Sequence, residues 1–252
     1  MALFKSSNPA LGSQVFQETA AENRLNNPTE VMTIDGTVNK VGLMGFIVFA
    51  FAAVSWNLTA SMPHLSGILT YGGAIAGFIT ALVIIFKKKM APMLSPLYCV
   101  FEGLFVGGIS YMYNAAFEGI VVQALFLTLG ILFALLFVYK AGWIAVTENF
   151  KLMVAAATGG ILIFYLVSFV LGFFGISIPL IHSNGLMGIG FSLFVIGIAS
   201  LNLVVDFDFI EEGAEVGAPK YMEWYAAFGL MVTLIWLYIE VLRLLAKLQS
   251  RD

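Results

Sequence analysis

Residues 200–225 read SLNLVVDFDFIEEGAEVGAPKYMEWY, and the interpretation of the whole chain starts from this stretch. It begins inside a long apolar run, passes through a group of acids and enters the last apolar run. Its six carboxylates, against the single base Lys220, are Asp206, Asp208, Glu211, Glu212, Glu215 and Glu223. Because only 11% of the chain is charged, such a concentration between two apolar runs is the strongest functional signal in the sequence.

The composition indicates an integral membrane protein. The chain has 252 residues, of which 60% are hydrophobic, whereas soluble domains are about 45–50% apolar and about 25% charged. The net charge of −3 argues against a nucleic-acid partner, because the basic surface that such binding needs is missing. The single Cys99 excludes a disulfide framework or a thiolate metal site.

Seven apolar segments follow a polar start. They cover roughly 41–60, 67–86, 93–113, 119–139, 153–175, 185–205 and 221–246. A helix needs about 20 residues to cross the hydrocarbon core, and backbone groups in lipid must be satisfied within the segment. The sequence therefore predicts an all-α, polytopic bundle of seven transmembrane helices, with a cytoplasmic polar tail over 1–40 and a membrane domain over 41–248.

Two local patterns in the tail predict further structure. Asn8-Pro9 suits the start of a short helix, because proline fits the first helical turn. The pair Asp35-Gly36 suits a tight hairpin turn.

Lysine and arginine alternate between the connections, which predicts orientation. Nine of them lie in the tail and in every second connection, and none lies in the three connections between: Lys5, Arg24, Lys40, Lys87, Lys88, Lys89, Lys140, Lys151 and Lys220. This pattern places the N-terminus in the cytoplasm.

The seventh segment is the least regular of the set. Only sixteen uncharged residues run from Trp224 to Ile239, and Arg243, Lys247 and Arg251 follow. A full crossing and a short helix shielded by its neighbours both fit. Lys247 is expected to lie beyond the end of this helix.

Glycines recur at close spacing and predict tight helix packing. The pairs and the group are Gly73 and Gly77, Gly103 and Gly107, and Gly185, Gly188 and Gly190.

Carboxylates inside apolar segments are candidates for function, because a charge at mid-membrane costs about 2.5–3.5 kcal/mol on insertion scales. Glu102 is either a hydrogen-bonded structural glutamate or part of an ion path. Glu240 is three residues before Arg243, so an ion pair is expected, with a place in an ion path as the alternative.

Asp206 is the strongest candidate because its neighbours are also acidic. Carboxylates brought together in a partly dry setting cannot all ionise, so one proton tends to be shared. Asp206 with Asp208 or Glu223 could therefore sense pH, and Asp206 with Glu223 could offer oxygen ligands to calcium. Glu211, Glu212 and Glu215 are interpreted as a solvated acidic loop.

No motif favours an enzyme. The sequence contains no HExxH, no GxSxG and no Cys–His pair placed for nucleophilic chemistry. A retinal-type photoreceptor would need a lysine within the last helix. We expect no catalytic activity and no cofactor, other than calcium as a permeant ion.

The acidic stretch resembles the Bax inhibitor family of multi-pass membrane proteins. The similar residues are the run Ser200–Asp206, the acidic run 207–217 and Tyr221. Glu102-Gly103-Leu104 also looks like a family feature, and Met32–Lys40 is similar to a bacterial branch.

The resemblance implies a seven-helix bundle with the last helix at its centre. It also implies a pH-sensitive calcium leak that is gated by two aspartates, one from helix six and one from helix seven. Asp206 matches the first aspartate, whereas the place of the second falls on Met231. The partner of Asp206 is therefore expected to be Glu223 or Asp208.

The resulting hypothesis is a cation leak in the inner membrane of a cell, which senses pH through Asp206, Asp208 and Glu223. Glu102 and Glu240 are candidates for the ion path. Its partners would be membrane lipid and calcium or other cations. A second hypothesis, from another functional class, is a non-conducting regulator of membrane proteins such as a membrane-anchored protease.

Overall fold

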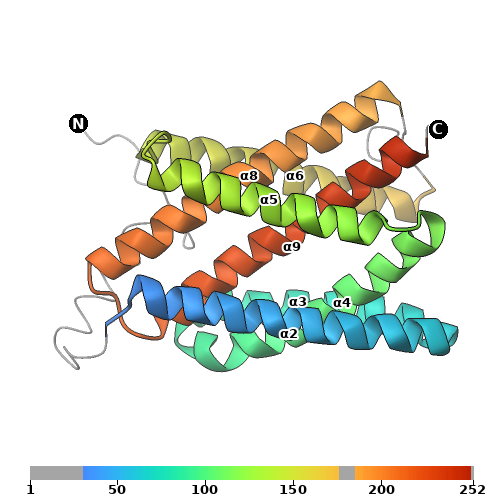
Figure 1. Ribbon diagram of the computed structural model, residues 1–252, viewed down its shortest axis with the longest axis horizontal. Coiled ribbons are helices and arrows are strands. Elements are labelled where there is room, and N and C mark those ends of the chain that lie inside the picture. Colours follow the sequence, from blue (N-terminus) through green and yellow to red (C-terminus); the bar gives the residue numbers. More distant parts are fainter. Residues whose placement is uncertain (1–30, 176–184, 251–252) are drawn as a thin grey trace. The chain divides into compact units, whose positions relative to one another are not determined.

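The computed structural model describes residues 31–175 and 185–250 (Figure 1). Seven long helices account for most of these residues: α2 Ile34–Ser61, α3 Ser66–Phe86, α4 Ala91–Ala116, α5 Ile120–Lys140, α6 Glu148–Phe173, α8 Leu186–Glu215 and α9 Met222–Gln249. The short 3-10 helices η1 Pro63–Leu65 and η2 Lys88–Met90 precede α3 and α4. The helix predicted after Asn8-Pro9 lies outside the described residues.

All seven helices are long and apolar enough to cross a membrane. The shortest have 21 residues, which at about 1.5 Å per residue matches a hydrocarbon core of about 30 Å. The predicted all-α, seven-span membrane protein is therefore confirmed. The last helix is not short, since α9 has 28 residues, and Lys247 lies inside it rather than beyond its end.

The predicted turn at Asp35-Gly36 is wrong, because these residues form the first turn of α2. Thr33 caps the helix: its side-chain oxygen accepts a hydrogen bond from the Gly36 N–H at 3.0 Å, which satisfies one of the free donors at a helix start. α2 thus begins at Ile34, within the stretch that was assigned to the polar tail.

The predicted acidic loop is also wrong, because α8 continues through the acids to Glu215. Glutamate is a good helix former, so charge alone does not end a helix where the apolar run ends. The helix ends at Glu215. Gly217, two residues later, has a left-handed φ of +69°, and the Ala218 N–H closes the end on the Gly213 carbonyl at 3.0 Å.

The described residues form two compact units, and the division falls within α8 and α9. Unit 1 contains 31–112 and 206–232, and unit 2 contains 113–175, 185–205 and 233–250. In unit 1, the first part of α9 contacts α2, α4 and α8. In unit 2, its second part contacts α5, α6 and α8. Within each unit, α9 therefore contacts three other helices, and its place at the centre of the whole bundle stays a prediction.

Close helix packing in unit 1 depends on glycine. A Cβ atom on Gly103 would lie 2.7 Å from the Val48 carbonyl oxygen, and one on Gly107 would lie 2.2 Å from the Ala52 carbonyl oxygen. α4 and α2 can therefore approach each other only where α4 has no side chain. The packing role predicted for these glycines is confirmed, whereas a Cβ at Gly185 or Gly190 would meet nothing within 4 Å.

Two adjacent glycines of α3 provide a matched test of this packing. A Cβ on Gly73 would lie 2.7 Å from the Phe101 carbonyl oxygen and 2.9 Å from the Phe105 backbone nitrogen, whereas one on Gly72 would meet nothing within 4 Å. Overpacking against backbone costs about 1–3 kcal/mol. We expect Gly73→Ala to lower the melting temperature in detergent clearly and Gly72→Ala to leave it unchanged or raise it slightly. Equal melting temperatures would show that the α3–α4 contact is looser than described.

Candidate functional site

Several charged side chains within the spans have protein neighbours in the described structure. They include Glu102, Asp206, Glu223, Glu240, Arg243 and Lys247. Charges of this kind are costly in a membrane and usually pair with one another or with backbone groups. The way in which each is compensated separates structural from functional candidates.

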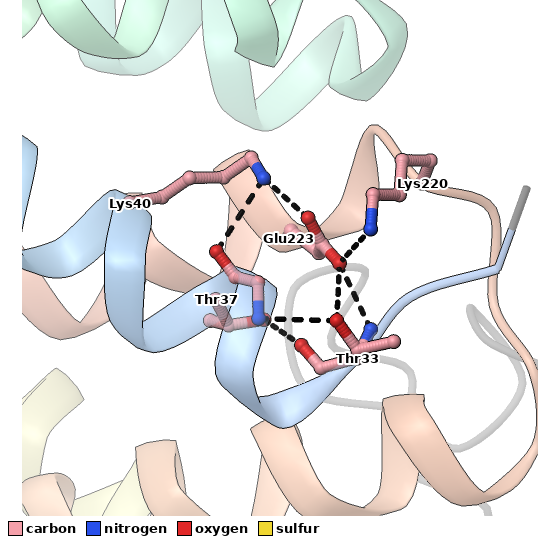
Figure 2. A network of polar contacts seen from close by, with 6 residues as sticks. Thr33, Thr37, Lys40, Lys220 and Glu223 are labelled. Atoms are coloured by element: carbon pink, nitrogen blue, oxygen red, sulfur yellow. Dashed lines mark hydrogen bonds and ion pairs between the residues drawn. The ribbon is translucent and has the colours of Figure 1, made fainter.

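The Glu223 carboxylate is fully buried and is the centre of a dense polar network (Figure 2). Its Oε1 atom accepts hydrogen bonds from the backbone N–H and the hydroxyl of Thr33, both at 2.9 Å. Lys220 Nζ lies 2.8 Å from the same oxygen. Lys40 Nζ forms an ion pair with Oε2. One carboxylate therefore joins the start of α2, the connection after α8 and the start of α9.

Gly36 makes room for this network. A Cβ atom at this position would lie 2.2 Å from Glu223 Oε1, so the carboxylate rests directly against the backbone of α2. Lys40 also donates to the Gly36 carbonyl at 3.4 Å and lies 5.4 Å from the centre of the Trp224 ring. The glycine that suggested a turn in the sequence instead admits an acid from α9.

The connection after α8 is held beside the same network. The Met32 N–H donates to the Ala218 carbonyl at 2.7 Å, and Val31 forms an isolated antiparallel bridge with Pro219. Together with Glu223, these contacts fix the residues that lead into α2 against the residues that lead into α9.

Asp206 lies against α9 at a different position along the helix from Glu223. It is half-buried on α8, and its Oδ1 atom lies 3.8 Å from the position that a Cβ on Gly229 would take. Gly229 follows Glu223 by six residues, which is about 9 Å along the helix. The hydrogen bonds of Glu223 go to Thr33, Lys40 and Lys220, so the structure does not bring Glu223 and Asp206 together as a hydrogen-bonded pair.

Asp208 lies on another face of α8. Two residues in an α-helix are rotated by about 200° relative to each other, so Asp206 and Asp208 cannot both face Gly229. Asp208 is half-buried, and Glu211 and Glu215 farther along the same helix are exposed. On this part of α8, Asp206 is thus an acid that the structure places against the backbone of α9 at Gly229.

Glu102 lies at the contact between α3 and α4 in unit 1. A Cβ on Gly77 of α3 would lie 2.8 Å from Glu102 Oε1, and the Tyr98 side chain, one turn earlier on α4, forms a hydrogen bond with the Glu102 carboxyl group. This arrangement is the hydrogen-bonded glutamate expected as one of two alternatives. A role in an ion path stays a prediction.

Unit 2 contains a second buried network around Glu240. Arg243 Nη1 donates to Oε1 and Oε2 of Glu240 at 2.9 and 3.1 Å, and to the Tyr165 hydroxyl at 2.8 Å. The Tyr165 hydroxyl donates to Glu240 Oε1 at 2.9 Å. The predicted Glu240–Arg243 pair is confirmed, and the tyrosine from α6 is a partner that spacing could not reveal.

Calcium does not fit the predicted Asp206–Glu223 ligand pair. Calcium takes about 6–8 oxygen ligands, whereas both oxygens of Glu223 already face ammonium groups. In the described part of the chain, no three His, Cys, Asp or Glu side chains are grouped so that they could hold a metal ion. The role of calcium as a permeant ion stays a prediction.

The fold and these networks define a multi-pass helical membrane protein that keeps charged side chains within its spans. A family model described as "Bax inhibitor 1 like" matches residues 8–250. The chain therefore belongs to the Bax inhibitor family, and the resemblance noted in residues 200–221 is confirmed. No curated protein and no solved structure matches the chain significantly.

Replacing Glu223 by glutamine tests the network. Removing one partner of a buried ion pair typically costs about 3–5 kcal/mol. Lys40, whose side chain is only 17% exposed, would be left without this ion pair. We expect Glu223→Gln to lower the melting temperature strongly. Lys220→Met should have a small effect, because the Lys220 side chain is 47% exposed and such pairs contribute little.

The double variant Lys40→Met/Glu223→Met is the informative control. It removes both charges, so it should be more stable than Glu223→Gln. A double variant that is less stable than Glu223→Gln would show that Glu223 does not act through Lys40.

Proposed function

We propose that the protein is a cation leak of the inner membrane, permeable to calcium and closed by protonation of Asp206. The family is associated with ion leak, which supports this class of function. The observation that carries the proposal is the position of Asp206, a half-buried acid of α8 facing the backbone of α9 at Gly229.

The position of Asp206 along α8 suits a gate at one end of a membrane path. It comes twenty residues after Leu186, the first residue of α8, which is about 30 Å of helix, the thickness of the hydrocarbon core. The last turns of α8 beyond it carry Asp208, Glu211, Glu212 and Glu215. Carboxylates at a path entrance raise the local concentration of cations.

The proposed gate has one carboxylate. Glu223, the expected second acid, is committed to two lysines, and the position of the family's second aspartate is the buried Met231. An ionised Asp206 attracts a cation and a protonated one does not, so the flux should decrease as the pH is lowered. In this proposal Glu223 keeps the start of α9 in place and does not titrate with Asp206.

The proposed topology follows from the distribution of lysine and arginine. With the N-terminus in the cytoplasm, Asp206 and the acidic turns of α8 lie near the cytoplasmic face. The path would then collect or release cations at that face. The proposal includes no enzymatic activity.

Calcium flux into liposomes that contain the purified protein tests the proposal. We expect a flux that decreases between neutral and acidic pH. Asp206→Asn should reduce the neutral-pH flux about tenfold, which corresponds to about 1.4 kcal/mol of barrier, and should remove the pH dependence. Asp208→Asn, a neighbouring acid on another face of α8, is the matched control and should keep the pH dependence.

An absence of flux at every pH would reject the leak. Copurification of a membrane protease from cells would in that case favour the non-conducting regulator. A flux that is unchanged in Asp206→Asn would leave a leak with its gate elsewhere.

A further inference from the structure

Lys247 is a buried lysine within the last helix, and the proposed gate at Asp206 does not use it. Its side chain lies two turns after Glu240 and one turn after Arg243, so the three charges share one face of α9. Lys247 is only 5% exposed. A buried ammonium group is costly unless its donors are satisfied.

The ammonium group of Lys247 is held by two uncharged oxygens from the start of α8. Nζ donates to the Gly188 carbonyl and to the Ser192 hydroxyl, each at 2.9 Å. Gly188 and Ser192 are one turn apart, so their oxygens lie on one face of the helix. Carbonyl and hydroxyl oxygens of this kind replace the hydration shell of a cation in selective membrane sites.

The nearest charged groups do not neutralise Lys247. Both oxygens of Glu240 accept hydrogen bonds from Arg243, and Arg243 repels a second cation. Among the described residues, no carboxylate lies within ion-pair distance of Lys247. The position is therefore lined by acceptor oxygens, which favour a cation over an anion.

We propose that Gly188 and Ser192 form a binding site for a small monovalent cation of the ammonium type, which the Lys247 ammonium group occupies as a tethered cation. Its fixed positive charge then limits the passage of free cations through unit 2, as positive side chains do in other selective pores. The binding site stands independently of the proposed leak, whereas the limiting role rests on it.

A purely structural role is the simplest alternative. A lysine in the last turn of a helix interacts favourably with the helix dipole, and Lys247 could do no more than fasten α9 to α8. That role predicts a loss of stability on substitution and nothing else. It predicts neither a cation that replaces the missing ammonium group nor a change in flux.

The experiment combines chemical rescue with flux measurements on the full-length chain. In Lys247→Ala, methylammonium chloride should raise the melting temperature by about 2–4 °C over the same concentration of tetramethylammonium chloride, because a ligand that binds the folded state stabilises it. The wild type and Lys247→Ala/Ser192→Ala should show no such difference. Lys140→Ala, which removes an exposed lysine at the end of α5, is the matched control.

In liposomes, Lys247→Ala should increase the monovalent cation flux about tenfold, and Lys247→Arg should behave like the wild type. Lys247→Met, which keeps most of the side-chain volume, replaces the alanine variant in the flux measurement if the latter is too unstable, and the same increase is expected. A folded Lys247→Ala or Lys247→Met that shows neither rescue nor increased flux overturns the proposal. An anion flux that disappears in Lys247→Ala overturns it as well.

The outcomes separate the site from the proposed leak. Rescue by methylammonium without flux in any variant would keep the cation site and reject the leak. A wild-type flux that depends on Asp206, together with no rescue and no change in Lys247→Ala, would keep the leak and reject the site. Rescue with an unchanged flux would keep the site and reject its limiting role.

Discussion

Complete burial of one carboxylate is the constraint on which unit 1 depends. Glu223 has no exposed surface, and an ion in that position is tolerated only when donors replace the water that it has lost. The donors come from Thr33, Lys40 and Lys220. Because these residues lie on different segments, satisfying one charge fixes the start of α2, the connection after α8 and the start of α9 together.

Unit 2 follows the same rule with other partners. Glu240 is satisfied by Arg243 and Tyr165, and Lys247 by oxygens of Gly188 and Ser192. Asn202 of α8 likewise donates to the Thr158 hydroxyl of α6 at 2.7 Å. Polar groups thus connect α9 and α8 to their neighbours in a protein whose outer surface is largely apolar. Such hydrogen bonds act in membranes where the hydrophobic effect between helices is weak.

The number of helices could be predicted from the sequence, but their ends could not. Length and apolar composition define a membrane span, so seven spans were predicted, and the described part of the chain contains seven. A helix does not stop at the membrane boundary, however, and α2 begins at Ile34 while α8 continues to Glu215. The helix ends are set by local residues. Thr33 caps the start of α2, and Gly217, with its left-handed φ, follows the end of α8.

Local spacing also decided which contacts could be predicted. The Glu240–Arg243 pair lies within one turn and follows from helical geometry. The Lys220–Glu223 pair has the same spacing, but Lys40 is 183 residues from Glu223. No pattern in a single sequence indicates such a distant partner. An acid next to other acids in sequence was therefore interpreted as part of an acidic pair, whereas the fold surrounds it with bases.

This reassignment changes what a pH-sensitive gate in this chain can be. Two coupled carboxylates lose their protons in two steps that belong to the pair, whereas a single carboxylate titrates in one. With Glu223 bound to lysines and Met231 buried at the place of the second aspartate, Asp206 is the one acid that the described structure sets against the backbone of α9 at Gly229. A gate built on it would respond to the charge of one side chain.

The first turns of α8, at the other end of the same helix, hold the ammonium group of Lys247, which is a cation that belongs to the protein itself. The two charges differ in kind, because a proton can remove the charge of Asp206, whereas the charge of Lys247 lies within unit 2 and is held there by two uncharged oxygens.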